Sequence, residues 1–123
     1  MAWASTPVDA YWVGNPGMGH PRLVTVTDCV YSGTGYGGGL LVTGATGATG
    51  PTKSDLGFTG TTDGSFNVTV QQVPKSITGA VYFAATRQAF YDITNEKLIV
   101  GTTAATDISD TTYRLIAVGK YGP

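Results

Sequence analysis

Glycine and threonine together make up almost a third of this chain, and this feature constrains its fold more than any other. Of the 123 residues, 18 are glycine and 20 are threonine, while only 12% are charged. Threonine is β-branched and favours the pleated surface of a sheet, whereas glycine favours turns and weakens the interior of a helix. The composition therefore predicts many short strands joined by tight loops.

The pattern of apolar residues agrees with this prediction. No stretch shows the apolar spacing of a helix longer than two turns, and alternation with a period of two recurs instead. Strands are predicted at residues 8–13, 22–30, 66–70, 78–86, 88–93, 97–101 and 112–118. Short strands that recur with turn signals about every 8–12 residues are typical of all-β folds. We therefore expect a single all-β domain, either an antiparallel β-sandwich or a jelly-roll-like fold.

The predicted domain covers residues 1–123 and contains two distinctive segments. Residues 1–7 precede the first predicted strand, and residues 31–64 form a glycine-rich central loop. Within that loop, residues 44–52 are three successive Gly-X-Y triplets, the repeat that collagen requires because only glycine fits at the axis of three chains. Three triplets are too few for an independent triple helix. They indicate either an extended loop or a place where three chains meet around a threefold axis.

The last predicted strand has apolar residues on both faces, which is typical of a central strand covered on both sides. Arg114, Ile116 and Val118 share one face. The other face is expected to lie in the core, where Tyr113, Leu115 and Ala117 pack with Phe66, Val68 and Val70.

Groups that support catalysis or bind metals are scarce. The only histidine, His20, lies in a predicted loop, and the only cysteine, Cys29, is predicted to be a buried, reduced thiol. This census disfavours a catalytic triad and a zinc site. The sole glutamate, Glu96, falls in a polar turn, and Asp107 and Asp110 are either a calcium-ligand pair or turn residues that bond their own backbone. We expect no enzyme activity, no metal and no cofactor.

Charge and hydropathy exclude further classes of partner. The net charge of −1 provides no basic stripe for nucleic acid, and no apolar run approaches the length of a transmembrane helix. The N-terminus lacks the basic and apolar regions of a secretion signal, so synthesis and assembly in a cytosol are expected. A surface of hydroxyl, amide and backbone groups is suited to being covered by another protein.

Several short motifs follow one another along the chain in a characteristic order. They are Pro7-Val8-Asp9-Ala10-Tyr11, Arg22-Leu23-Val24, Tyr36-Gly37-Gly38, Ser54-Asp55-Leu56-Gly57-Phe58, Val81-Tyr82-Phe83, Tyr91-Asp92, Asn95-Glu96-Lys97-Leu98 and Arg114-Leu115-Ile116-Ala117-Val118-Gly119. This order resembles that of a family of small structural proteins of tailed bacteriophages, the capsid decoration or cement proteins. The chain departs from the family pattern at Asn95-Glu96, where Asn-Gly is usual, and at the inserted triplets of residues 44–52.

The resemblance implies an antiparallel β domain that binds the major capsid protein on the outside of the virion, often as a homotrimer, and stabilises the capsid without catalysis. Such particles assemble in the host cytoplasm. Trp3, Tyr36 and Tyr121 are candidate contacts with the capsid or a neighbouring subunit, because aromatic side chains bury a large area at low entropic cost. For Trp3 and Tyr121 the alternative is a place in the core. The alternative function is a carbohydrate- or receptor-binding module of a phage fibre.

Overall fold

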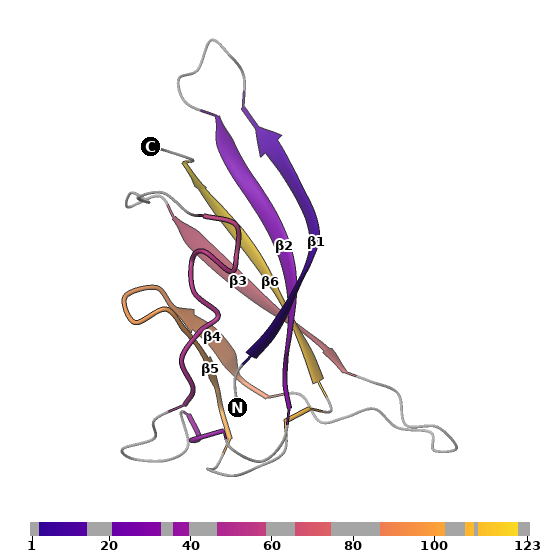
Figure 1. Cartoon of the computed structure of the whole chain (residues 1–123), viewed down its shortest axis with the longest axis vertical. Helices are drawn as coiled ribbons and strands as arrows, with labels where there is room; N and C mark the ends of the chain where they lie inside the picture. The colour runs from indigo at the N-terminus through magenta and orange to yellow at the C-terminus, as the bar shows by residue number, and fades with distance from the viewer. Residues whose placement is uncertain are drawn as a thin grey trace, which may run out of the picture.

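The structure is a computed structural model that describes residues 3–14, 21–32, 36–39, 47–58, 66–74, 87–102, 108–109 and 111–120 (Figure 1). Every regular element in these ranges is a β-strand, and no helix occurs among them, so the all-β prediction is confirmed. The strands are β1 (Trp3–Val13), β2 (Arg22–Tyr31), β3 (Asn67–Pro74), β4 (Ala89–Asp92), β5 (Lys97–Val100) and β6 (Thr111–Lys120).

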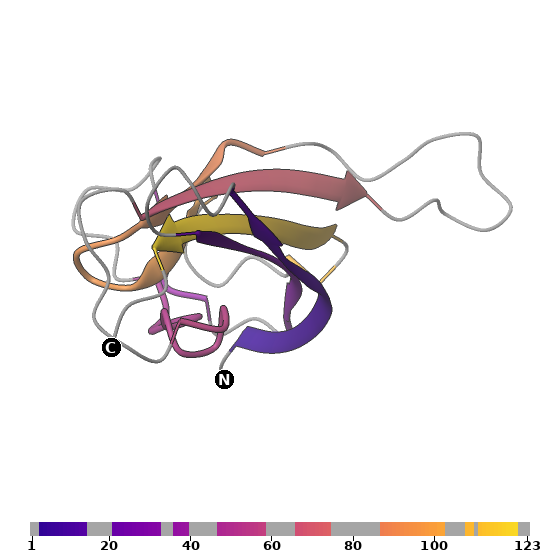
Figure 2. The same ribbon diagram turned by 90° about the horizontal axis from the view of Figure 1, so that it is seen from above.

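The strands form two antiparallel sheets. The larger has four strands in the order β1-β2-β6-β3, and the smaller is the β4-β5 hairpin. The described strands do not close into a barrel. Figure 2 shows the 47–58 segment on one side of the large sheet, below β6 in that view. The large sheet therefore has an inner face, toward this segment, and an outer face.

β1 begins earlier than the sequence predicts. It starts at Trp3 rather than at residue 8, so most of the predicted N-terminal segment belongs to the strand. It pairs with β2 from Trp3↔Tyr31 to Val13↔Arg22, and the register shifts between Pro7 and Asp9. A bulge on an edge strand accommodates proline because no ladder hydrogen bond is needed there. Pro7 therefore interrupts the strand without marking its start.

The remaining strand predictions are largely confirmed. The predicted hairpin at residues 88–101 is β4-β5, and the strand predicted at residues 66–70 is β3, which continues to Pro74. The strand predicted at residues 78–86 lies outside the described residues.

β6 is a central strand, as predicted, and its inner face lies in the core. Tyr113, Leu115 and Ala117 are fully buried, Phe66 is buried, and Val68 and Val70 pack against this cluster from β3. Much of the other side of the core consists of buried apolar residues from the segments 47–58, 87–102 and 108–109, namely Leu56, Phe58, Tyr91, Leu98, Val100 and Ile108.

The described residues do not test the prediction that both sides of β6 are covered. No described strand packs over the outer face, where Arg114, Ile116 and Val118 are partly buried and Val24 of β2 is buried. The apolar residues of this face lie beside one another on neighbouring strands, because Ile116 and Val118 are in register with Val26 and Val24 of β2.

The 47–58 segment is tied to the β4-β5 hairpin. The Gly50 N–H donates to the Glu96 carbonyl at 3.0 Å, and the Leu98 N–H donates to the Gly50 carbonyl at 3.0 Å. The Tyr91 hydroxyl donates to the Pro51 carbonyl at 2.6 Å. Gly50 has a φ of 87°, in the left-handed region that favours glycine. The described part of the Gly-X-Y triplets is thus hydrogen-bonded to β5 in the single chain.

Candidate functional site

The outer face of the large sheet is a broad surface of low charge. Its centre is apolar: Val24 and Val26 of β2 lie in register with Val118 and Ile116 of β6. Around this centre, the exposed neighbours include the uncharged polar residues Thr6 on β1 and Asn67, Thr69 and Gln71 on β3. Asp9, opposite Val26, is exposed and charged, whereas Tyr11 and Val73 are exposed and apolar. Such a surface has little charge to desolvate when another protein covers it.

The outer face carries an ion pair, Asp28–Arg114, whose opposite charges cancel each other. The Arg114 Nε donates to Asp28 Oδ1 at 2.8 Å, and Arg114 Nη2 donates to Asp28 Oδ2 at 3.0 Å. The two side chains are 37% and 25% exposed, respectively. The hydrogen bond and the charge of Asp28 raise the pKa of Arg114. This bidentate pair holds both charged groups in the plane of the face and leaves the face without net charge at this point.

The free side of β1 is the most apolar exposed part of the described chain. Val8, Tyr11, Trp12 and Val13 are 49%, 48%, 56% and 49% exposed, and we call these four residues the apolar edge. Tyr11 and Val13 lie on the outer face, opposite Val24 and Arg22, whereas Trp12 lies opposite Leu23 on the inner face. Figure 1 shows this end of the β1-β2 hairpin extending beyond the β4-β5 hairpin. Exposed aromatic and aliphatic groups gathered in one place are typical of protein contacts.

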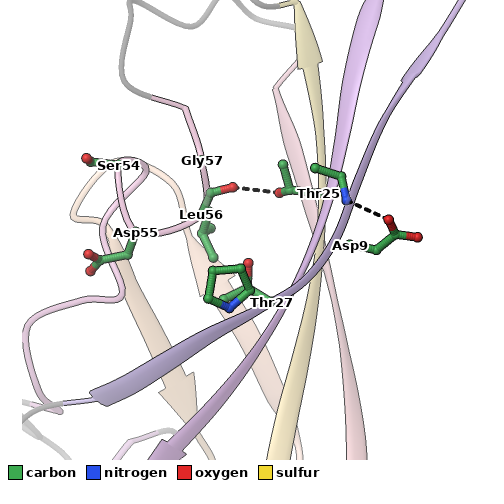
Figure 3. Close-up of a pocket in the computed structure, with 9 residues that line it drawn as sticks. Asp9, Thr25, Thr27, Ser54, Asp55, Leu56 and Gly57 are labelled. Atoms are coloured by element: carbon green, nitrogen blue, oxygen red, sulfur yellow. Dashed lines mark hydrogen bonds between the residues drawn. The ribbon is translucent and has the colours of Figure 1, made fainter.

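A pocket of about 220 Å³ lies beside the β1 bulge, between the inner face and the turn at residues 54–57 (Figure 3). Its walls include Pro7, Ala10 and Leu56, and the Thr25 hydroxyl donates to the Leu56 carbonyl at 2.6 Å. Asp9 and Asp55 also border it, but Figure 3 shows their carboxylates pointing away from one another. The pocket therefore does not assemble a pair of carboxylates for acid–base chemistry.

Both carboxylates at the pocket accept hydrogen bonds from backbone N–H groups nearby in the chain. Asp9 Oδ1 accepts the Ala10 N–H at 2.8 Å, and Asp55 Oδ2 accepts the Thr52 N–H at 2.9 Å. Across the described residues, no three His, Cys, Asp or Glu side chains gather in a group that could hold a metal ion. The same part of the chain contains no helix long and apolar enough to span a membrane.

The structure brings two of the three predicted contact residues together, but inside the core. Trp3 is 8% exposed and Tyr36 is fully buried, with ring centroids 6.0 Å apart. Tyr31 and Tyr113 join them in the same aromatic cluster. The early start of β1 places Trp3 over the core, so in the single chain neither ring offers much surface to a partner. Tyr121 lies outside the described residues.

Two other residues considered from the sequence, Cys29 and Glu96, occupy structural positions. Cys29 is buried, as predicted, and burial raises the pKa of its thiol to about 11. Glu96 is partly buried, and its Oε1 accepts the Lys53 N–H at 2.8 Å. His20, Asp107 and Asp110 lie outside the described residues.

Sequence reasoning missed the apolar edge and the Asp28–Arg114 pair. The consecutive apolar residues Tyr11, Trp12 and Val13 showed that this strand carries apolar groups on both faces, because successive side chains point to opposite faces. That they are exposed follows from the position of β1 at the edge of the sheet. The ion pair had no local signal, since its two residues are 86 positions apart.

Comparison with protein-family models, with curated proteins and with solved structures finds no match to this chain. The outer face, the apolar edge and the pocket beside the bulge are therefore the features from which we argue function.

Proposed function

We propose that this chain is a structural protein of a bacteriophage virion that binds the outside of the capsid and stabilises it. The observation that carries the proposal is the outer face of the large sheet, which combines an apolar centre, a rim with few charged groups and a neutralised ion pair. A face of this kind can be covered at little desolvation cost. Repeated over a capsid lattice, many modest contacts would sum to a large stabilisation of the particle.

The motif order supports the same proposal. The Arg22-Leu23-Val24 motif lies in β2 and the Arg114–Gly119 motif lies in β6, so both contribute directly to the outer face. The antiparallel all-β architecture is also what the resemblance to decoration proteins implies. We further propose that β4-β5 is the second layer of a sandwich, because Leu98 and Val100 share the core with Leu115.

In this proposal the partner is the major capsid protein, and the protein acts on the virion surface without catalysis or a cofactor. Three copies meet on the particle, with the region of residues 36–52 near the threefold axis or at a contact with the capsid. Tyr11 and Trp12 are better candidates than Trp3 and Tyr36 for contacts with the capsid or a neighbouring subunit, because their rings are exposed. Tyr121 remains a proposed contact.

A reconstitution experiment tests the proposal. Particles assembled without the protein should lose DNA at a lower temperature than decorated particles, and adding the purified protein should restore their heat resistance. Thr69→Arg places a long charged side chain on the exposed rim of the outer face and should lower occupancy on the capsid. Thr94→Arg, in the exposed turn between β4 and β5, is the matched control and should bind as the wild type does.

A second function uses a different surface. The exposed rings of Tyr11 and Trp12 also suit stacking on sugars, which favours the carbohydrate- or receptor-binding module of a phage fibre as the alternative. Equal heat resistance of decorated and undecorated particles, together with glycan binding that Trp12→Ala abolishes, would support the fibre module and contradict the capsid proposal.

A further inference from the structure

The two edges of the large sheet are built differently. Along β3, the exposed side chains of Asn67, Thr69 and Gln71 are polar, Val73 is the one large apolar side chain exposed among the described residues of this strand, and the Gln72 side chain bonds the backbone of Arg87. Beyond its bulge, β1 instead exposes Tyr11, Trp12 and Val13. Sheet edges are commonly protected by proline, charge or a bulge, because their unpaired backbone groups attract other strands.

The protective features of β1 end in the middle of the strand. Pro7, the register shift and Asp9 protect the part near the bulge. Residues 10–13 (Ala-Tyr-Trp-Val) contain no charge, no proline and no bulge, and the described strands place no neighbour on this side of them. This short stretch therefore has the backbone and the side chains to pair with another strand.

We propose that its partner is β1 of a second copy, paired antiparallel around a twofold axis at Tyr11. The distribution of charge on the outer face supports this choice. Asp9 lies on one side of Tyr11 along β1, and Arg22 lies in register with Val13 on the other side. A twofold rotation about Tyr11 places Asp9 of one copy next to Val13 of the other, one strand away from that copy's Arg22. Opposite charges approach twice, once on each side of the axis.

The inner face offers a second, independent match. In the same register, Trp12 of one copy lies opposite Ala10 of the other, so a large exposed ring meets a small residue. Ala10 lines the pocket of about 220 Å³ beside the bulge, whose walls include Pro7 and Leu56. The indole of Trp12, 56% exposed in the single chain, is thus brought to the mouth of this pocket in the second copy. Aromatic rings seated in apolar pockets are the usual anchors of protein interfaces.

The pairing joins two four-stranded sheets into one eight-stranded sheet and makes their outer faces continuous. It goes beyond the proposed function, because it concerns two copies of this chain and needs no capsid.

Cysteine cross-linking of the purified full chain tests the register. Opposite residues in an antiparallel pair have Cβ atoms about 4.5–5.5 Å apart, close to disulfide distance. In the proposed register, position 11 of one copy lies opposite position 11 of the other. The Tyr11→Cys variant should therefore form disulfide dimers in air. The wild type should not, because Cys29 is buried, and neither should the matched edge variant Thr69→Cys on β3. Equal cross-linking of the two variants, or none for Tyr11→Cys, would overturn the proposal.

Sedimentation equilibrium over a range of protein concentrations tests the charge arrangement. Asp9→Arg should weaken dimer formation roughly tenfold, because two attractive contacts become repulsive. The double variant Asp9→Arg with Arg22→Asp should recover dimer formation, a result that a merely structural role of either residue would not give. A wild type that remains monomeric at the highest concentration, or a double variant as weak as the single one, would show that β1 does not pair in this way.

Discussion

The indole of Trp3 packs edge to face against the ring of Tyr31, its partner in the β1-β2 register, with centroids 5.3 Å apart and ring planes at 69°. This pair joins the start of the chain to the aromatic cluster of Tyr36 and Tyr113. The N-terminal strand is therefore part of the core at one end and exposed at the other, and the first two predictions follow from this difference.

The two tryptophans of β1 should respond differently to truncation. Trp3→Ala removes a ring that is 8% exposed and should cost about 3–5 kcal/mol of unfolding free energy. Trp12→Ala, on the same strand but 56% exposed, should change it by about 0.5 kcal/mol or less at concentrations where the chain is monomeric. Urea unfolding followed by circular dichroism measures both. Equal losses would mean that β1 does not enter the core at Trp3.

The hydroxyl of Tyr36 should stabilise the folded chain through its two hydrogen bonds to the backbone of β5. It accepts the Val100 N–H at 2.9 Å and donates to the Leu98 carbonyl at 3.2 Å, so it ties residues 36–39 to β5. Tyr36→Phe leaves the buried Val100 N–H without this acceptor and should cost about 1–3 kcal/mol. Tyr11→Phe, at an exposed ring, is the control and should be neutral in the same denaturation assay. A neutral Tyr36→Phe would exclude this link.

Leu115 and Ile116 test which face of β6 is buried. Leu115 is fully buried, and Leu115→Ala should cost about 2–5 kcal/mol because a cavity remains. Ile116 is the next residue, on the partly exposed outer face, and Ile116→Ala should cost less. Thermal unfolding gives the comparison. If the Leu115 variant melts within a degree or two of the wild type, the assignment of the inner face is wrong.

Burial of Cys29 predicts a loss of stability at alkaline pH. Its thiol pKa is raised from 9.0 to about 11 in the folded chain, chiefly by burial. Below pH 9 the thiol is protonated in both states. As the pH rises from 9 toward 11, the unfolded chain releases the proton first, so the free energy of unfolding falls, by on the order of 2 kcal/mol over the interval.

Urea midpoints measured from pH 8 upward check this effect. The wild-type curve should fall more steeply above pH 9 than that of Cys29→Ala, which has no thiol to titrate. Burial also raises the pKa of Tyr36 and Tyr91, so both proteins should lose further stability at still higher pH. Parallel curves for the two proteins between pH 9 and 10 would contradict the assigned role of the thiol.

The sequence by itself determined the class of structure. Threonine and glycine content predicted strands and turns, and alternation located most of β2, β3, the β4-β5 hairpin and β6. It also placed Tyr113 and Leu115 on the buried face of a central strand, because side chains alternate along a strand whatever its neighbours are. The buried state of Cys29 was predicted because a sole cysteine has no disulfide partner and a free thiol behaves as a small apolar group.

Only the tertiary structure decided which surfaces are left open. The register of β1 with β2 brings Trp3 into the core and leaves Tyr11 and Trp12 exposed, although all three are aromatic residues of one strand. Likewise, the pairing of β2 with β6 brings Asp28 to Arg114 across 86 positions of sequence. Burial and ion pairing depend on which strands become neighbours. That choice is made by contacts between residues distant in sequence, which no local pattern contains.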